Sequence, residues 1–390
     1  MSSTPTPAPA PAPTSAPTRA PGRHQALETP APPQGLWNEW KDAVSTRTVI
    51  LILGVLGLQL AFILSYVGAF HAPTPSEISI AVVAPEQISS QLVPQLNSLD
   101  GAPLQAAAVA DEATARQQIL DDSTSAALIV DPAGTTDRLL VAGGGGTSVS
   151  GAVQTVITGA QAAQQRTAVV EDLVPLQPGD GRGLIGFYLV IGWIVGGYLV
   201  AALLGVSAGS RPATTRRAIF RLGALVPYAV LSGLGGAIIV DPVLGAITGH
   251  FTALLAVGAL LVFAAGAVTM AFQVVFGVLG IGLTVLVFVI LGNPTAGGAY
   301  QAQLLPPFWR ALGYLLPNGA GTETIRRIVY FGGQGIGIHL AVIVAWAVIG
   351  ALVAVLAARF HYHRALAVEY PVASRDGAQP APAASDSALA

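Results

Sequence analysis

The apolar run "FTALLAVGALLVFAAGAVTMAFQVVFGVLGIGLTVLVFVIL", residues 251–291, decides the fold class of this chain. It contains no charged residue, and it is about twice as long as the ~20 residues that a helix needs to cross a bilayer. It therefore predicts two membrane helices, 251–269 and 273–291, joined by a tight turn near Met270–Gln273. The whole chain is 53% hydrophobic and only 10% charged, whereas about a quarter of the residues of a soluble domain are charged.

Further apolar runs reach the length of a membrane helix. They are 48–70, 184–207, 222–240 and 338–358. The sequence thus predicts an α-helical membrane protein with six transmembrane helices. Both ends of the chain are different from these apolar runs. Residues 1–35 are rich in Pro and Ala, and residues 374–390, the last part of the expected cytoplasmic tail 359–390, have a similar composition. Such segments bury too little apolar surface to offset the entropy of ordering, so we expect both to be disordered.

The distribution of positive charge predicts that both termini are cytoplasmic. Four arginines fall in the short loop 208–221, whereas four are spread over the long segment 71–183. Short cytoplasmic loops carry such an excess of Lys and Arg. Segment 71–183 is then expected to lie outside the cell.

Segment 71–183 alternates between strand-like and helix-like patterns, which predicts an extracytoplasmic α/β domain. We expect strands at 78–85, 104–110, 125–131 and 137–143, and helices at 86–99, 111–122 and 148–173. The glycine-rich stretch 143–151 resembles a phosphate loop but lacks its lysine. We interpret it as a turn in which Thr147 or Ser148 caps the following helix.

The composition excludes several classes of function. The chain has no cysteine, which excludes disulfides, thiolate chemistry and Cys-ligated metal sites. Its one lysine, Lys41, lies between Trp40 and Asp42 and cannot complete a Walker A motif. The net charge of −2 gives no case for a nucleic-acid partner. We therefore expect no catalytic, cofactor or metal site, and any ATP hydrolysis must come from a partner subunit.

The predicted spans contain no Asp, Glu, Lys or Arg. Ion-coupled transporters and proton pumps need ionisable side chains inside the membrane, and charge-lined pores need rings of them. Their absence disfavours both classes. Apolar or amphiphilic cargo remains, as does a membrane scaffold without cargo.

The stretch "LLPPFWRALGYLLPNGAGTETIRR", residues 304–327, is too apolar for an ordinary loop and too often broken by proline for a membrane span. We expect the segment 293–337 to form short helices that dip into the outer leaflet, with Thr322 capping the second one. Its aromatic residues and arginines favour the headgroup zone, and the arginines either anchor the segment to lipid or hold anionic cargo. The residues that we expect at this outer gate are Pro306, Pro307, Trp309, Arg310, Pro317, Arg326 and Arg327.

The predicted order of elements resembles that of the ABC-2 type permeases. It consists of one membrane helix, an external α/β domain and five further helices, with a broken apolar segment before the last helix. The chain is most similar to their actinobacterial branch, which is related to the YhgE/Pip family. "ISIAVVAP" (78–85) resembles the opening external strand of that family, and residues 112–141 resemble its helix–strand–strand unit. Residues 292–333 are similar to its segment before the final helix. This resemblance implies a bacterial plasma membrane protein that works as a homodimer or as a heterodimer with a paralogue.

The resemblance also implies a separate cytoplasmic ATPase subunit, close to an elbow helix and to the loop after the second span. Residues 36–47 suit an amphipathic helix at the membrane surface, with its tryptophans as interface anchors. The residues that we expect to couple the chain to the ATPase are Trp37, Trp40, Arg211, Arg216, Arg217 and Arg221. Alternatively, the arginines only set the topology and bind anionic lipid.

Two functions follow from these expectations. The first is the permease subunit of an ATP-driven exporter for hydrophobic or amphiphilic cargo, such as a lipid, a drug or a metabolite. The second is a non-transporting scaffold or receptor-like protein that acts through its extracytoplasmic domain.

Overall fold

The structure is a computed structural model that describes residues 45–212 and 214–369. It is mostly helical with one small sheet, and it identifies a multi-pass membrane protein by its long apolar helices. The expected tail 1–35, the tryptophans of the expected helix 36–47 and residues 370–390 lie outside the described residues.

Five helices within the described residues are long and apolar enough to cross a membrane. They are α2 (Thr46–Phe70), α6 (Ile185–Ser207), α7 (Thr215–Ile238), α8 (Phe251–Phe276) and α13 (Ile336–Glu369). Helix α7 starts before the expected span because Thr214 caps it, its side chain accepting a hydrogen bond from the backbone N–H of Arg217 at 3.3 Å. A π-helical turn, Ile239–Val243, extends it at the other end.

The turn that we expected near Met270–Gln273 is wrong, because α8 continues through these residues to Phe276. The chain turns at Gly277, whose φ of 66° favours glycine. It returns as α9 (Leu279–Val285), a π-helical stretch (Leu286–Leu291) and α10 (Gly292–Thr295). These pieces form an apolar segment, Leu279–Thr295, that is shorter than the other five helices.

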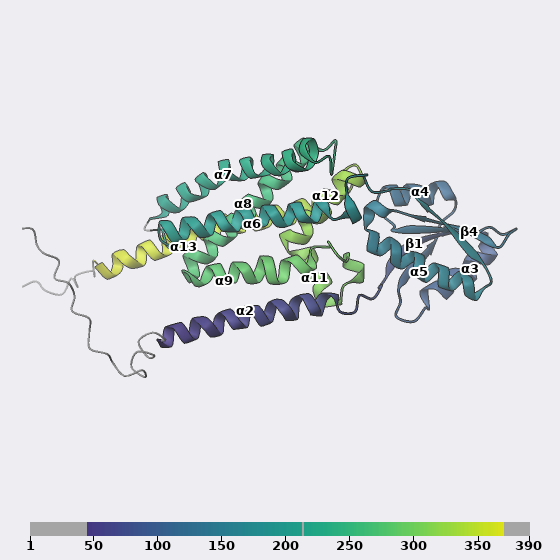
Figure 1. Cartoon of the computed structure of the whole chain (residues 1–390), viewed down its shortest axis with the longest axis horizontal. Coiled ribbons are helices and arrows are strands. Elements are labelled where there is room, and N and C mark those ends of the chain that lie inside the picture. The colour runs from purple at the N-terminus through teal and green to yellow at the C-terminus, as the bar shows by residue number, and fades with distance from the viewer. Residues whose placement is uncertain (1–44, 213, 370–390) are drawn as a thin grey trace, which may run out of the picture. The chain divides into compact units, whose positions relative to one another are not determined.

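Helix α8 forms the core of the helical bundle, with α6, α7 and α13 packed around it (Figure 1). It is the most buried of the five helices, because 56% of its most apolar stretch lies inside the structure. Glycines allow the close approach, because a Cβ at Gly197, Gly233 or Gly350 would lie 2.4 to 2.7 Å from the α8 backbone. Small residues at helix contacts are the usual means by which membrane helices pack closely.

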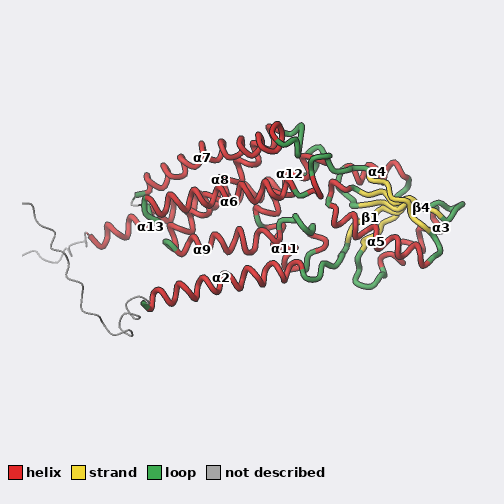
Figure 2. The backbone as a smooth tube through the Cα atoms, in the orientation of Figure 1, coloured by secondary structure: helices red, strands yellow, loops and turns green. Residues whose placement is uncertain are grey.

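The α/β domain contains a five-stranded sheet with the order β2-β1-β3-β4-β5 (Figure 2). The strands are β1 (Ile78–Val83), β2 (Leu104–Ala108), β3 (Ala126–Ile129), β4 (Thr136–Val141) and β5 (Thr167–Asp172). All neighbours are parallel except β3 and β4. Helices α3 (Glu86–Asn97) and α5 (Thr147–Ala163) cover one face of the sheet, and α4 (Glu112–Leu120) covers the other.

Two expectations for this domain are wrong. The helix expected at 148–173 ends at Ala163, and Thr167–Asp172 forms strand β5 instead. Its valines favour a strand, and pairing with β4 satisfies its backbone. Neither Thr147 nor Ser148 caps α5: the N-cap is Gly146, and both hydroxyls donate hydrogen bonds to carbonyls outside the helix.

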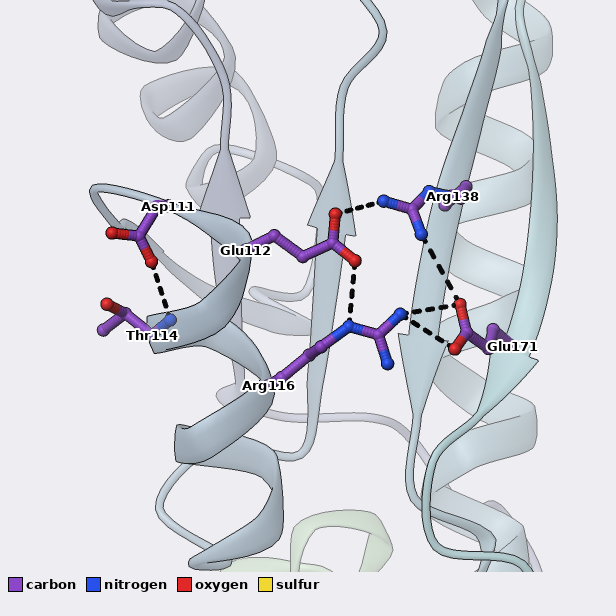
Figure 3. Close-up of polar contacts among 6 residues, drawn as sticks. All are labelled: Asp111, Glu112, Thr114, Arg116, Arg138 and Glu171. Carbon is purple, nitrogen blue, oxygen red and sulfur yellow. Dashed lines mark hydrogen bonds and ion pairs between the residues drawn. The ribbon is translucent and has the colours of Figure 1, made fainter.

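A network of alternating charges ties α4 to the sheet (Figure 3). Arg116 of α4 bonds to Glu112 on its own helix and to Glu171 on β5, each at 2.8 Å. Arg138 on β4 bonds to Glu112 and lies 3.6 Å from Glu171. These bonds hold the pKa of Glu112 below its usual value, because Arg138 and Arg116 both favour the ionised carboxylate.

The segment before α13 forms two short helices, α11 (Pro307–Leu315) and α12 (Pro317–Tyr330). A proline occupies the first turn of each, where its missing N–H costs nothing. The expected cap at Thr322 is wrong, because α12 begins earlier and contains this residue. The Thr322 hydroxyl donates to the carbonyl of Asn318 at 3.1 Å.

Candidate functional site

Residues 296–335, which we call the gate segment, are bound to the α/β domain by hydrogen bonds. The Ser148 hydroxyl donates to the Ala299 carbonyl at 2.8 Å. The backbone N–H of Val149 donates to Oε1 of Gln301 at 3.3 Å, and that of Ser76 donates to the Gln303 carbonyl at 3.0 Å. The glycine-rich stretch that resembles a phosphate loop is therefore part of a contact with the gate segment.

An ion pair joins the same two parts of the molecule. Arg327 of α12 lies 2.6 Å from the carboxylate of Asp122, which follows α4. It also donates to the Gln334 carbonyl at 3.1 Å. Burial raises the pKa of Asp122 to about 6, although Arg327 alone would lower it. The Asp122–Arg327 pair is thus a charged contact in a largely desolvated place.

A polar cavity of about 160 Å³ lies beside this ion pair. Its walls include the pair itself and four further polar side chains: Gln301, Tyr314, Glu323 and His339. Since a water molecule takes up ~30 Å³ in the liquid, the cavity has room for several waters. Sequence reasoning missed this junction, because its residues are far apart in the chain and no motif links them.

The structure places the expected gate residues at or near this junction. The prolines begin α11 and α12, and the ring of Trp309 packs on Gly68 of α2, where a Cβ would lie 3.5 Å away. Arg310 lies 3.9 Å from Glu77 of the α/β domain. Arg326 is only 8% exposed and donates to the Gly297 carbonyl at 2.8 Å. A lipid-facing anchor role is therefore wrong for Arg326.

The arginines expected at the ATPase divide into two groups. Arg221 donates to the carbonyls of Gly209 and Ala208 at 2.8 and 2.6 Å, so it caps the end of α6, and Arg211 donates to the Val275 carbonyl at 3.3 Å. Arg216 and Arg217 are exposed, and neither side chain makes a hydrogen bond or ion pair to the described residues. Trp37 and Trp40 lie outside the described residues.

An apolar groove of about 480 Å³ lies between α6 and α7, at the end where α6 follows the α/β domain. Trp193, which is 3% exposed, forms its floor and donates its indole N–H to the Ser232 carbonyl at 3.1 Å. Tyr188 and Leu244 at its walls are exposed, so the groove opens on the surface of the bundle. Among the residues that the structure describes, no charged side chain lines it.

Glycines create the space of this groove. A Cβ at Gly192 or Gly235 would meet no atom within 4 Å, although both residues line the groove. At Gly236 a Cβ would lie 2.5 Å from the Trp193 ring, so this glycine is what allows the ring to pack closely against α7. In the sequence, the only sign of this groove is the presence of glycines on two neighbouring spans. The same pattern is typical of close helix packing, so it does not by itself predict a groove.

Comparison with known proteins identifies no relative. No protein-family model, no curated protein and no solved structure matches the chain. The resemblance to ABC-2 type permeases therefore stays a prediction from the sequence.

Proposed function

We propose that this chain is the membrane permease subunit of an ATP-driven ABC-2 type exporter for hydrophobic or amphiphilic cargo. The observation that supports it best is the apolar groove between α6 and α7, which is uncharged and open on the surface of the bundle. Ligand sites of this kind are concave and mostly apolar, with a few polar groups for orientation. Cargo entering from a lipid leaflet would lose little solvation in such a groove.

In this proposal the apolar segment Leu279–Thr295 is the sixth membrane crossing, and α11 and α12 form a re-entrant outer gate. Asn318 supports such an arrangement, because it is fully buried and its amide donates to the carbonyl of Phe288 and to Asn293, both at 3.0 Å. Irregular backbone at membrane depth needs partners of this kind. Both termini are cytoplasmic, and two permease chains form the transporter.

The exporter needs an ATPase partner, and Arg216 and Arg217 offer it two exposed cations at one end of α7. Purification of the full chain from its native host in mild detergent, followed by mass spectrometry, tests this directly. We expect a soluble P-loop ATPase in near-equal amount, and at least ~10-fold less of it with Arg216→Ala/Arg217→Ala, as loss of ~1.4 kcal/mol of binding would give. The matched control is Arg359→Ala, which changes an exposed arginine in the C-terminal third of α13.

A receptor-like scaffold is the second candidate, and the junction between the α/β domain and the gate segment favours it. An ion pair and several hydrogen bonds there would pass a binding event outside the membrane to the helices. In that case the wild-type preparation contains no ATPase, and deleting residues 75–180 removes the function. Equal recovery of an ATPase from wild type and from the double arginine variant would exclude only the assigned coupling residues.

A further inference from the structure

Five glutamines surround a cavity of about 180 Å³ that lies entirely within the α/β domain. We call it the glutamine pocket, and its glutamines are Gln87, Gln91 and Gln95 of α3, Gln161 of α5 and Gln164, which directly follows α5. The three on α3 recur every fourth residue and therefore share one face of the helix. Gln164 donates to Oε1 of Gln95 at 3.3 Å, which links the two helices across the rim.

Gln161 is the buried member of this set. It is 3% exposed, and its Oε1 is enclosed without a hydrogen-bond partner among the described residues. Buried polar atoms in proteins are nearly always paired, so an unpaired one calls for a partner from outside the chain. The other four glutamines are exposed and bring further amide groups to the same cavity.

The pocket offers no free charge to a ligand. Arg166 lies at its wall, but its guanidinium donates to both carboxylate oxygens of Asp137 and to the carbonyls of Gly134 and Asp131, at 2.5 to 3.0 Å. Asp137 is buried and also accepts a hydrogen bond from the backbone N–H of Asp131 at 2.8 Å. The two charges therefore compensate each other, and an ionic ligand would find no counter-charge.

The position of the pocket in the sheet is the one at which open α/β sheets bind ligands. Its walls include the start of α3, which follows β1, and Val130, which follows β3. The strand order places β1 between β2 and β3. The connection that leaves β1 leads to β2 on one side, and the connection that leaves β3 leads to β4 on the other side, so the two diverge at the carboxyl ends of β1 and β3. Ligands bind outside the carboxyl ends of strands at such a point.

This edge also faces away from the chain's links to the membrane helices. The chain enters the sheet at the amino end of β1, and it leaves at the carboxyl end of β5. Because β4 and β5 run opposite to β1 and β3, both links lie at the other edge. The glutamine pocket is thus accessible without passing the membrane helices.

We propose that the glutamine pocket binds a neutral, hydroxyl-rich ligand of the size of one sugar unit. Amide groups both donate and accept hydrogen bonds, as do the hydroxyls of a sugar, and Ile88, Leu92 and Val130 give an apolar wall for its C–H face. The volume is below the ~300 Å³ at which pockets for drug-sized ligands begin, which fits one ring of a saccharide. This activity is separate from the proposed export and needs no ATPase.

Saturation-transfer NMR on the purified full chain in detergent micelles tests this. The probes are glucose and N-acetylglucosamine as neutral sugars, glucuronate as an anion, glucosamine as a cation and N-acetylalanine methylamide as a peptide amide. We expect transfer to the neutral sugars and weaker transfer to the charged ones. Gln161→Leu should weaken sugar binding about tenfold, as the loss of one or two buried hydrogen bonds would.

Matched variants keep the result decisive. Gln154→Leu changes a glutamine two turns earlier on α5 that does not line the pocket, and it should bind sugar like wild type. If Gln161→Leu fails to fold, Gln91→Ala on the exposed rim should still weaken binding several-fold. Three results would overturn the proposal: no transfer to any neutral sugar, unchanged binding in both pocket variants, or a preference for the peptide amide.

Discussion

At the scale of single residues, Asp122 makes the stability of the junction depend on pH. Its pKa is raised from 3.8 to about 6 by burial. A raised folded-state pKa means that the folded chain holds this proton more tightly than the unfolded chain. The resulting contribution to stability is fully present below pH 3.8 and is lost as the pH rises through about 6.

Asp122→Asn should remove this dependence, because the amide stays neutral at every pH. When the pH is raised from 4 to 7, we expect wild type to gain less stability than the variant, with a difference in the free energy of unfolding on the order of 1–3 kcal/mol. Thermal unfolding of both proteins across this range measures it. Asp121→Asn, at the exposed neighbouring position, is the control. Parallel pH profiles for wild type and Asp122→Asn would contradict the assignment.

At the scale of elements, the groove between α6 and α7 depends on glycines that have free space beside them. Gly192→Leu and Gly235→Leu should fill it without a clash, because a Cβ at either position meets nothing within 4 Å. We expect both variants to fold and to bind a dansyl-labelled lipid at least ~10-fold more weakly, as the loss of ~1.4 kcal/mol of contact would give.

The control for the groove is Gly223→Leu, because Gly223 also has free space beside it on α7 but does not line the groove. Fluorescence titration of the labelled lipid into each purified variant gives the comparison. The same weakening in all three variants, or in none, would remove the groove as a binding site.

Comparison of the predicted with the observed helices and strands shows what the periodicity of apolar residues predicts and what it misses. The sequence placed a helix over α8 and a strand over β1, because each has a long or alternating apolar pattern. The expected helix 148–173 wrongly included β5, because this strand is mostly exposed and lacks the alternating apolar pattern that marks a half-buried strand. The turn after α8 was predicted too early, because the apolar run 251–291 is unbroken there. The structure marks the turn only by the positive φ of Gly277.

At the scale of the whole molecule, the candidate sites arise where distant segments meet. The junction joins Asp122 to Arg327, and the glutamine pocket joins α3 to α5. Each residue taken alone reads as an ordinary surface side chain. The residues of the outer gate were easier to predict, because their prolines and arginines stand together in the sequence. The partners of those arginines could not be predicted, since they depend on the packing of the α/β domain.

The junction should make the α/β domain and the helices unfold together, since the described residues from Val55 onward belong to one compact unit. Arg327→Gln removes the charge at 2.6 Å from Asp122 and leaves a partly buried carboxylate with a weaker partner. We expect one calorimetric transition in wild type and two in this variant, with the α/β domain melting first. Arg310→Gln, whose partner Glu77 is exposed and 3.9 Å away, should keep one transition. A single transition in Arg327→Gln would show that the hydrogen bonds of the gate segment alone hold the two parts together.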